Sequence, residues 1–443
     1  MNPENSQVAI DLLIYPKWII PIEPTGVTLS DHALAINDGC IVDLLPCEKA
    51  LKLYSPREEV ELPSHVLLPG LVNLHTHAAM SLLRGYADDL PLNTWLSEHI
   101  WPAEARHLSA DFVHTGTLLA CAEMLRGGIT TFNDMYFFPA AAADAVRQSG
   151  MRAALGLVVL DHPTNYAADA DDYLAKGLAL RDACKDYPLL SFCLAPHAPY
   201  TVSDKTFEKI ATLSAQLEIP IHTHLHETRH EIAESITQYG VRPMQRLHTL
   251  GLLGPQFIAV HAVHLEAAEI DQLSLTGCHI AFCPTSNLKL GSGIPNIKPI
   301  HQRGINFGLG TDSAASNNRL DIFQEMRLST LLAKGVNEDA TLLTAHQALQ
   351  AATLNGASAL GLDQQIGSLL PGKAADLCAV RLDDWMLQPC FDPASHLVYT
   401  AGRDNVTHTW VAGKLQMQNG LPSNIEIQQL LARTNIWHNR LAY

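Results

Sequence analysis

The chain has 443 residues, and its 45 acidic against 29 basic side chains give a formal net charge of −16. Intrinsic disorder is excluded, because 47% of the residues are hydrophobic and only 17% are charged, which is enough apolar material for a large buried core. The acidic balance also argues against nucleic acid as a partner, since it offers no basic surface for phosphates.

The first 64 residues predict short β-strands broken by Gly, Pro and Asp, at 8–14, 18–20, 33–37 and 40–45. No basic segment precedes an apolar run here, and no run of about 18 apolar residues occurs, so we expect neither a signal peptide nor a membrane span. The nine cysteines are dispersed without a CxxC pair. Such a pattern indicates reduced thiols, and we therefore expect a soluble cytoplasmic protein.

The middle of the chain alternates short apolar runs with helical segments. The spacing predicts amphipathic helices over 204–217 and 265–275, the first with Ser203 or Asp204 as its N-cap. Eight runs read as strands covered on both faces: 66–73, 129–133, 152–160, 189–195, 219–224, 257–261, 279–283 and 305–310. This rhythm over about 250 residues is typical of an α/β fold of the (β/α)₈ TIM-barrel type, with a doubly wound open sheet as the alternative.

The C-terminal segment is again β-rich, with predicted strands at 375–381 and 406–411 before a polar tail. Because both chain ends are β-rich, we expect them to pair into one small composite β-sandwich domain. The predicted division is 1–64 and 367–443 for the composite domain and 65–366 for the barrel. The connection 78–128 after the first barrel strand is unusually long, and long loops in compact domains tend to be functional.

Histidine-rich groups follow several predicted strands. His75 and His77 come directly after the first run, and residues two apart on a strand point the same way, so both imidazoles can face one metal ion. Three further polar groups follow the fifth, sixth and eighth runs, at 222–227, 261–264 and 311–313. Barrel enzymes build their active sites at these strand ends, so a single metal centre explains all four groups together.

Three imidazoles and one carboxylate form a suitable ligand set for a divalent ion such as zinc. By strand parity His222, His224 and His226 would share a face, so the pattern alone leaves all three open as the third ligand. A glutamate three residues past a ligating histidine, here Glu227, is placed to shuttle protons at the metal's water.

Taken together, these motifs resemble the amidohydrolase superfamily, and within it the cytoplasmic deaminases of 5′-methylthioadenosine and S-adenosylhomocysteine. The resembling stretches keep the family's order across nearly the whole chain. They are PGLVNLHTHAAMSLLRG (69–85), LAPHAPYTVS (194–203), HTHLHET (222–228), VHAVHL (260–265), CPTSNLKLGSG (283–293), LGTDSAASNN (309–318) and IGSLLPGKAADLCAV (366–380).

The resemblance implies roles for individual residues. The implied metal ligands are His75, His77, His224 and Asp312. Glu227 matches the general acid/base, and His261 and Asp312 match the residues that orient the hydrolytic water and take its proton. His222, His226 and His264 then become neighbours of the site.

The resemblance also implies one divalent ion per subunit, with Zn²⁺ favoured over Fe²⁺ or Mn²⁺. Members with two metals use a bridging lysine after the fourth strand. No lysine occurs between Pro188 and Asp204, which favours a single metal.

Three further residues resemble substrate-binding groups of these deaminases. Glu104 matches the carboxylate that accepts hydrogen bonds from the ribose 2′- and 3′-hydroxyls, and His197 matches the residue that contacts the purine. Trp95 matches an aromatic of this group that stacks on the base or forms a wall beside it. The structural alternatives are a solvated helix glutamate, a buried core histidine and a tryptophan that packs the loop. No arginine for a homocysteine carboxylate occurs in 153–172, so methylthioadenosine is favoured over adenosylhomocysteine.

The expected function is metal-dependent hydrolytic deamination of an adenine nucleoside at C6, which yields the 6-oxo product and ammonia. 5′-Methylthioadenosine is the first candidate, with S-adenosylhomocysteine and adenosine behind it. The alternatives are a related amidohydrolase acting on guanine, a triazine or another cyclic amidine, and a non-catalytic zinc-binding protein. Glu227 and His261 argue against the last, because a structural site needs neither. We expect a small-molecule nucleoside as partner, no nucleic acid or membrane, and a homo-oligomer.

Overall fold

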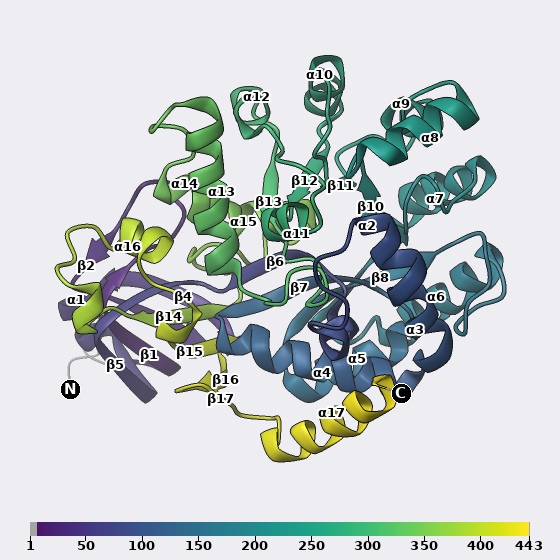
Figure 1. Cartoon of the computed structure of the whole chain (residues 1–443). Coiled ribbons are helices and arrows are strands. Elements are labelled where there is room, and N and C mark those ends of the chain that lie inside the picture. The colour runs from purple at the N-terminus through teal and green to yellow at the C-terminus, as the bar shows by residue number, and fades with distance from the viewer. Residues whose placement is uncertain (1–6, 443) are drawn as a thin grey trace.

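The computed structural model describes residues 7–442 and contains two sheets (Figure 1). Eight parallel strands, paired in chain order, form the first sheet: β6 Leu71–Thr76, β7 Ile129–Tyr136, β8 Arg152–Val159, β9 Leu190–Pro196, β10 Ile221–Leu225, β11 Phe257–His261, β12 His279–Phe282 and β13 Phe307–Leu309. The predicted TIM-type barrel is confirmed. The doubly wound alternative is wrong, because each strand is hydrogen-bonded to the strands before and after it in sequence, so the strand order is never reversed.

Hydrogen bonds between β6 and the segment after β13 close the barrel. The Asp312 N–H donates to the His75 carbonyl at 2.9 Å. The Thr311 N–H donates to Asn73 Oδ1 at 2.9 Å, and Asn73 Nδ2 donates back to Thr311 Oγ1 at 2.7 Å. The first and last strands therefore meet at the edge where the predicted ligands lie.

Helices surround the barrel (Figure 1). Their bounds are α4 Ala110–Arg126, α5 Pro139–Ser149, α6 Ala170–Cys184, α7 Asp204–Leu217, α8 Arg229–Tyr239, α9 Pro243–Thr249, α10 Ala267–Thr276, α11 Pro284–Lys289, α12 Ile297–Gln302, α13 Ile322–Asn337, α14 Ala345–Ala351 and α15 Leu354–Ala359. The predicted helix over 204–217 is confirmed as α7, with Ser203 as its N-cap accepting from the Thr206 N–H. The helix predicted over 265–275 is α10.

Before α4, the long connection after β6 folds into four short helical segments: η1 Ala78–Leu83, α2 Leu92–Thr94, the π-helical η2 Trp95–Ile100 and α3 Trp101–His107. Single π-helical turns are rare and often occur at functional sites. Two of the predicted substrate-binding residues lie in this connection, Trp95 in η2 and Glu104 in α3.

Both chain ends contribute to the second sheet, a mixed sheet of nine strands in the order β17-β16-β15-β14-β5-β1-β3-β4, with β2 paired to β1. Its strands are β1 Val8–Ile19, β2 Leu29–Ser30, β3 His32–Asn37, β4 Cys40–Pro46, β5 Tyr54–Pro69, β14 Leu377–Arg381, β15 Val406–Val411, β16 Lys414–Gln418 and β17 Leu421–Pro422. The chain ends meet where β14 pairs antiparallel with β5, with Leu377 opposite Pro69. The composite β-domain is confirmed, and its strands are hydrogen-bonded into one continuous sheet.

The predicted run 66–73 spans two strands and not one. Residues up to Pro69 belong to β5 of the mixed sheet, and the barrel strand β6 begins at Leu71 after Gly70. Both strands are apolar and buried at this junction, so hydrophobicity alone does not separate them. The division into 1–64, 65–366 and 367–443 stays a prediction.

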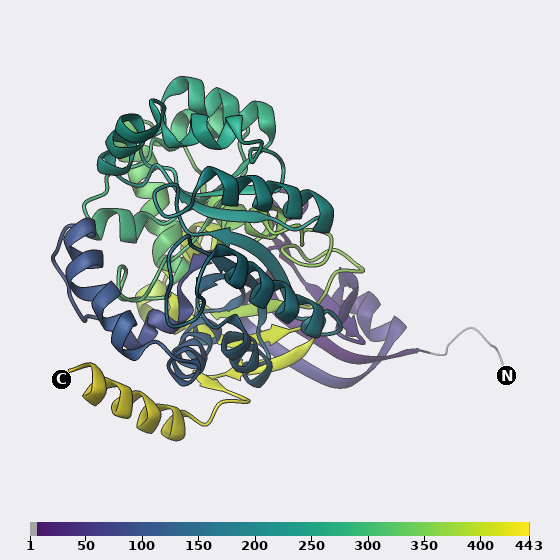
Figure 2. The same ribbon diagram turned by 90° about the vertical axis from the view of Figure 1, so that its right-hand side faces the viewer.

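The remaining helical segments are α1 Cys47–Leu53, η3 Trp385–Leu387, α16 Pro393–Tyr399, η4 Arg403–Asn405 and α17 Ile427–Leu441. The segment read as a polar tail thus contains a helix, which lies along the outside of the barrel (Figures 1 and 2). Arg433 of α17 forms an ion pair with Asp111 of α4 at 2.6 Å, and Trp437 packs edge-on against Phe112. Within residues 7–442 no helix has the length and apolar character needed to span a membrane.

Candidate active site

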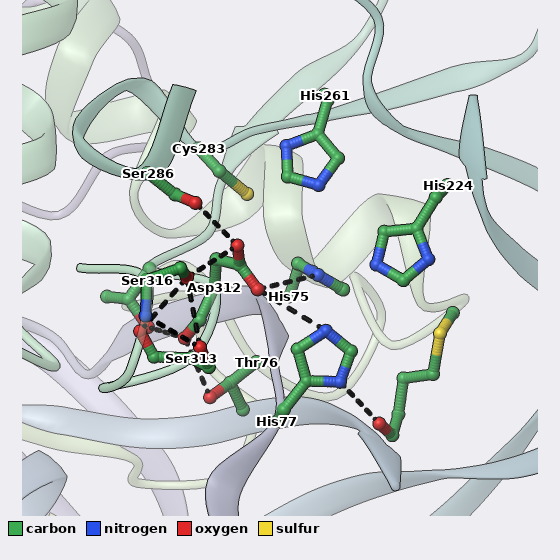
Figure 3. A network of polar contacts seen from close by, with 12 residues as sticks. His75, Thr76, His77, His224, His261, Cys283, Ser286, Asp312, Ser313 and Ser316 are labelled. Atoms are coloured by element: carbon green, nitrogen blue, oxygen red, sulfur yellow. Dashed lines mark hydrogen bonds and ion pairs between the residues drawn. The ribbon is translucent and has the colours of Figure 1, made fainter. Parts of the chain in front are cut away.

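His75, His77 and Asp312 meet at the carboxyl end of the barrel strands (Figure 3). The Nε2 atoms of His75 and His77 lie 3.4 and 3.3 Å from Asp312 Oδ1. A Cβ on Gly310 would lie 2.8 Å from His75 Cβ, so only glycine lets the chain after β13 approach β6 this closely. His75 and Asp312 are 237 positions apart in the sequence. Closure of the barrel brings them together, with His77 beside them.

His224 and His261 complete the cluster from β10 and β11. One nitrogen from each of His75, His224 and His261 lies within 4.8 Å of the others, and the same holds for the donor atoms of His75, His77 and Asp312. The ring centroids of His75 and His224 are 5.0 Å apart. All five predicted residues of the metal and water site therefore converge on one point.

The outward nitrogen of each ring is held by a hydrogen bond. His77 Nδ1 donates to the Met135 carbonyl and His224 Nδ1 to the His197 carbonyl, each at 2.6 Å. A carbonyl can only accept, so both rings carry a proton on Nδ1, and Nε2 is the nitrogen that each ring turns toward the cluster.

The donor set fits a divalent cation. His75 Nδ1 lies 2.9 Å from His222 Nε2, whereas the buried His75 Nε2 has no hydrogen-bond partner within residues 7–442. Imidazole nitrogens that face inward, with the outer nitrogens fixed by protein groups and one carboxylate among them, are typical of metal sites.

Two serines fix the carboxylate of Asp312. Ser286 and Ser316 donate to its Oδ2 at 2.6 and 2.7 Å, which leaves Oδ1 facing the histidines (Figure 3). Burial opposes ionisation of Asp312, but the contacts with His75 and His77 outweigh it and hold its pKa well below the usual range. The carboxylate is therefore ionised.

Strained backbone accompanies these groups. Asp312 has a φ of 59° and His261 a φ of 68°, in the left-handed region that non-glycine residues seldom adopt. His261 Nδ1 is paired with Asn287 Oδ1 at 2.8 Å, so its Nε2 faces the cluster. Such strain persists where the surroundings fix a residue tightly, as they do here.

Glu227 lies directly beside this cluster. Its Oε2 is 3.7 Å from His261 Nε2, and Ser292 Oγ donates to its Oε1 at 3.3 Å. Burial raises the pKa of Glu227, and the nearby charges of Asp312 and Glu231 raise it further, against the lowering effect of His261. The carboxyl group therefore holds a proton more readily than an exposed glutamate does, as a proton shuttle requires.

A cavity of ≈ 620 Å³ opens above the cluster, in the size range of small-molecule sites. His77, His224, Glu227, His261 and Asp312 all line it, together with the predicted substrate-binding residues Trp95, Glu104 and His197. The three come from separate segments: η2, α3 and the end of β9. The sequence predictions are thus brought together around one cavity.

Glu104 faces the cavity and is held by Tyr136, whose hydroxyl donates to Glu104 Oε1 at 2.7 Å. Burial raises the pKa of Glu104 to about 7, against the lowering effects of the Tyr136 hydrogen bond and of His77. On another wall, His197 Nδ1 pairs with Thr201 Oγ1 at 3.0 Å. Trp95 is buried, with 5% of its surface exposed.

The other histidines of the motifs surround the site. His222 contacts His75, as described above. Strand β10 ends at Leu225, and His226 has a φ of 53°, so it leaves the face that strand parity assigned to it. His226 Nε2 accepts the Met244 N–H at 3.2 Å, and His264 Nε2 donates to the Ser292 carbonyl at 2.7 Å. Of the three histidines that parity left open, His224 is the one whose ring lines the cavity.

Sequence reasoning missed the polar side chains that hold these groups: Tyr136, Ser286, Asn287, Ser292 and Ser316. Four of them lie inside motifs quoted above, in CPTSNLKLGSG and LGTDSAASNN. Small polar residues in loops carry no spacing signal of their own, so their partners emerge only from the tertiary structure.

Comparisons with known proteins agree with this geometry. Residues 66–416 match the family model described as the amidohydrolase family. A 5-methylthioadenosine/S-adenosylhomocysteine deaminase of Teredinibacter turnerae is 45% identical over 432 residues, which cover 98% of each chain. A 5′-deoxyadenosine deaminase of Methanosarcina mazei is 40% identical over 411 residues, covering 92% of this chain and 93% of that one.

Solved structures give the same picture. An adenosine deaminase from Xanthomonas campestris with bound zinc is 46% identical, with a TM-score of 0.97 over 99% of this chain and 100% of that one. The atrazine chlorohydrolase TrzN from Arthrobacter aurescens, with zinc, has a TM-score of 0.89 over 96% of this chain and 100% of that one. At 23% identity, that second likeness supports the fold alone.

Proposed function

The chain belongs to the amidohydrolase family, and we propose that it is a metal-dependent deaminase that hydrolyses adenine nucleosides at C6, with 5′-methylthioadenosine as its preferred substrate. One observation carries the proposal. A cluster of metal-binding type, a buried glutamate with a raised pKa and a second carboxylate suited to a diol line the same small cavity. The first two serve hydrolysis of a ring C–N bond, and the third selects a nucleoside over a free base.

We propose that His75, His77, His224 and Asp312 hold one divalent ion, Zn²⁺ in preference to Fe²⁺ or Mn²⁺. The inward Nε2 atoms and the ionised carboxylate support this ligand set, and zinc is present in the related adenosine deaminase. When bound, such an ion supplies Lewis acidity, which lowers the pKa of water at the site toward about 7.

The protein's own groups then handle the protons. His261 Nε2, fixed by the bond from Nδ1 to Asn287, and Asp312 Oδ1 orient the attacking water and accept its proton. Glu227 donates its proton to N1 of the adenine ring, which makes C6 more electrophilic. As the new C6–O bond forms and the C6–N bond breaks, Glu227, ionised by its transfer to N1, takes up the proton accepted from the water and passes it to the departing amine. The proton of the C6 hydroxyl then returns to Glu227, so that ammonia and the 6-oxo nucleoside result. Proton transfers of this kind contribute about 10²–10⁴-fold each.

Glu104 supplies specificity for the sugar in this proposal. Its carboxylate accepts hydrogen bonds from the ribose 2′- and 3′-hydroxyls, while the hydrogen bond from Tyr136 fixes the orientation of the carboxylate. His197 contacts the purine, and Trp95 walls the base. All of them line the cavity that contains Glu227, which supports one bound nucleoside spanning both ends.

The lining supports a neutral 5′ substituent. Ile100, Leu108, Val158 and Leu160 contribute apolar surface, and among the described residues no arginine lines this cavity. A methylthio group can bury apolar surface there, whereas an amino-acid carboxylate would lack a cationic partner. We therefore place 5′-methylthioadenosine ahead of S-adenosylhomocysteine.

An ammonia-release screen tests the proposal. Purified protein, with its metal content measured on the same sample, is assayed on methylthioadenosine, S-adenosylhomocysteine, adenosine, guanine and cytosine. We expect the highest kcat/KM for methylthioadenosine and one zinc per chain. Release from guanine or cytosine alone would overturn the nucleoside assignment, and zinc-loaded protein inactive on all five would overturn the proposed function. A cytoplasmic location and a homo-oligomer are further proposals from the sequence.

A further inference from the structure

Glu325 is a fully buried carboxylate that lies outside the cavity. It belongs to the first turn of α13, and its exposed fraction is 0%. Glu325 takes part in none of the ion pairs formed within residues 7–442, although burying an unpaired carboxylate is costly. Burial raises its pKa to about 7, against the lowering effect of its hydrogen bonds.

The two oxygens of Glu325 bind two separate segments. Oε2 accepts the backbone N–H of Thr285 at 3.1 Å, and Oε1 accepts Asn317 Nδ2 at 2.8 Å. Thr285 lies in α11, which follows β12, and Asn317 lies in the loop that follows β13. Asn317 Nδ2 also donates to the Thr311 carbonyl at 2.8 Å, beside Asp312.

Each of these partners is the sequence neighbour of a serine that holds Asp312. Thr285 precedes Ser286 and Asn317 follows Ser316, and the two serines donate to the same oxygen, Oδ2 of Asp312 (Figure 3). One carboxylate on α13 thus ties together the two segments that supply both donors.

We propose that Glu325 is a positioning residue that fixes the orientation of the Asp312 carboxylate by holding the segments of Ser286 and Ser316 in register. With Oδ2 occupied by both hydroxyls, Oδ1 is left directed at His75 and His77. Asn287, two residues past Thr285, pairs with His261, so the same contact also braces that ring. The inference rests on the proposed function only in taking Asp312 as a group of the metal centre.

A purely structural role makes a different prediction. If Glu325 only caps free N–H groups at the start of α11, its loss would lower the melting temperature and leave the folded enzyme's metal affinity and kcat unchanged. If it positions Asp312, metal affinity and kcat change in protein that remains folded.

The experiment compares Glu325→Gln with a matched control, Ser329→Ala. Glutamine keeps the shape of Glu325 but has one acceptor oxygen, so it cannot accept both donors. Ser329 is also buried on α13, one turn further along, and its hydroxyl has no partner within residues 7–442. Zinc affinity is measured by chelator competition, and kcat and KM are measured on methylthioadenosine.

We expect Glu325→Gln to weaken zinc affinity and lower kcat, each by about 10–100-fold, with KM within about twofold of wild type. Glu325→Asp, which keeps two acceptor oxygens, should recover part of the zinc affinity, and Ser329→Ala should match wild type. If Glu325→Gln does not fold, Asn317→Ala removes one of the two contacts and should weaken zinc affinity in the same direction. A folded variant, Glu325→Gln or Asn317→Ala, that retains wild-type zinc affinity would overturn the proposal.

A double-mutant cycle tests the route through the serines. In a Ser286→Ala/Ser316→Ala background, Glu325→Gln should change zinc affinity by less than about twofold, because the donors it positions are gone. A full, independent effect in that background would overturn the inference. The zinc measurement needs no substrate, so it separates failure of this inference from failure of the proposed deaminase activity.

Discussion

The floor and the wall of the cavity are built in different ways. On the floor, His224 and His261 lie on barrel strands, and the ring nitrogen of each that faces away from the cluster has a polar partner. On the wall, Trp95 and Glu104 lie on short helical segments of one long connection, and within residues 7–442 the one side-chain hydrogen bond to Glu104 comes from Tyr136.

In the proposed mechanism, this difference separates the groups that carry out the chemistry from those that select the substrate. Strand ends in a closed barrel cannot move independently, so they hold ligands and proton-transfer groups to the accuracy that catalysis needs. A connecting segment can change in sequence without disturbing the barrel, so it is suited to choosing the substrate. The predictions below test whether floor residues control turnover and wall residues control which nucleoside is bound.

The largest effect is expected on the floor, from Glu227→Gln. The amide cannot deliver a proton to N1 or to the leaving amine, so kcat should fall by about 10²–10⁴-fold. Zinc content should stay at the wild-type level, because Glu227 is not a proposed ligand. Steady-state kinetics with metal analysis checks both values, and Glu234→Gln, an exposed position of α8, serves as control. Loss of zinc in proportion to activity would show that Glu227 is not the proton shuttle.

On the wall, Glu104→Gln should affect binding selectively. Loss of a charged acceptor for two hydroxyls should lower kcat/KM for methylthioadenosine by about 10–100-fold. A 2′,3′-dideoxy analogue should be affected by less than about twofold, because it has no hydroxyls to lose. The exposed Glu98→Gln in η2 is the matched control. Equal losses on both nucleosides would contradict the assignment of Glu104 to the diol.

The pH dependence of KM should also report on the wall. The pKa of Glu104 is raised to about 7, so below this pH the carboxyl is increasingly protonated and accepts the two hydroxyls less well. KM for methylthioadenosine should therefore fall as pH rises from about 6 to 8, by about fivefold or more. Glu104→Gln should remove this dependence, whereas a profile that persists in the variant would assign it to another group.

The smallest effect is expected from Tyr136→Phe. This change removes the hydroxyl that donates to Glu104 and leaves the ring, so kcat/KM should fall by about 3–10-fold. Because that hydrogen bond lowers the pKa of Glu104, its loss should move the fall in KM to higher pH. Kinetics of the variant across the same pH range provide the check. A pH profile of KM that does not shift would contradict the prediction that Tyr136 lowers the pKa of Glu104.

The prediction of the fold from sequence succeeded where a physical period was present. Each of the eight apolar runs overlaps one barrel strand, and the amphipathic segment 204–217 is α7. It was less accurate at the junction of β5 and β6, where both strands are apolar and buried, and at the tail. There α17 buries only Leu430 and Trp437 of its fifteen residues, too few for a clear apolar face to stand out.

At the site, the sequence by itself determined which groups are available: two histidines at the end of one strand, a histidine near the end of a second strand with a glutamate after it, a histidine at the end of a third, and an aspartate after the last. It could do so because strand ends in a parallel barrel share one edge, so polar residues that follow apolar runs are brought to the same place. Only the tertiary structure decided which of these atoms face each other. Ser286 and Ser316 donate to Asp312, and Glu325 accepts from their sequence neighbours Thr285 and Asn317, so these contacts join segments that follow different strands. Such contacts depend on how the closed barrel packs its loops, and no local pattern in the chain encodes that packing.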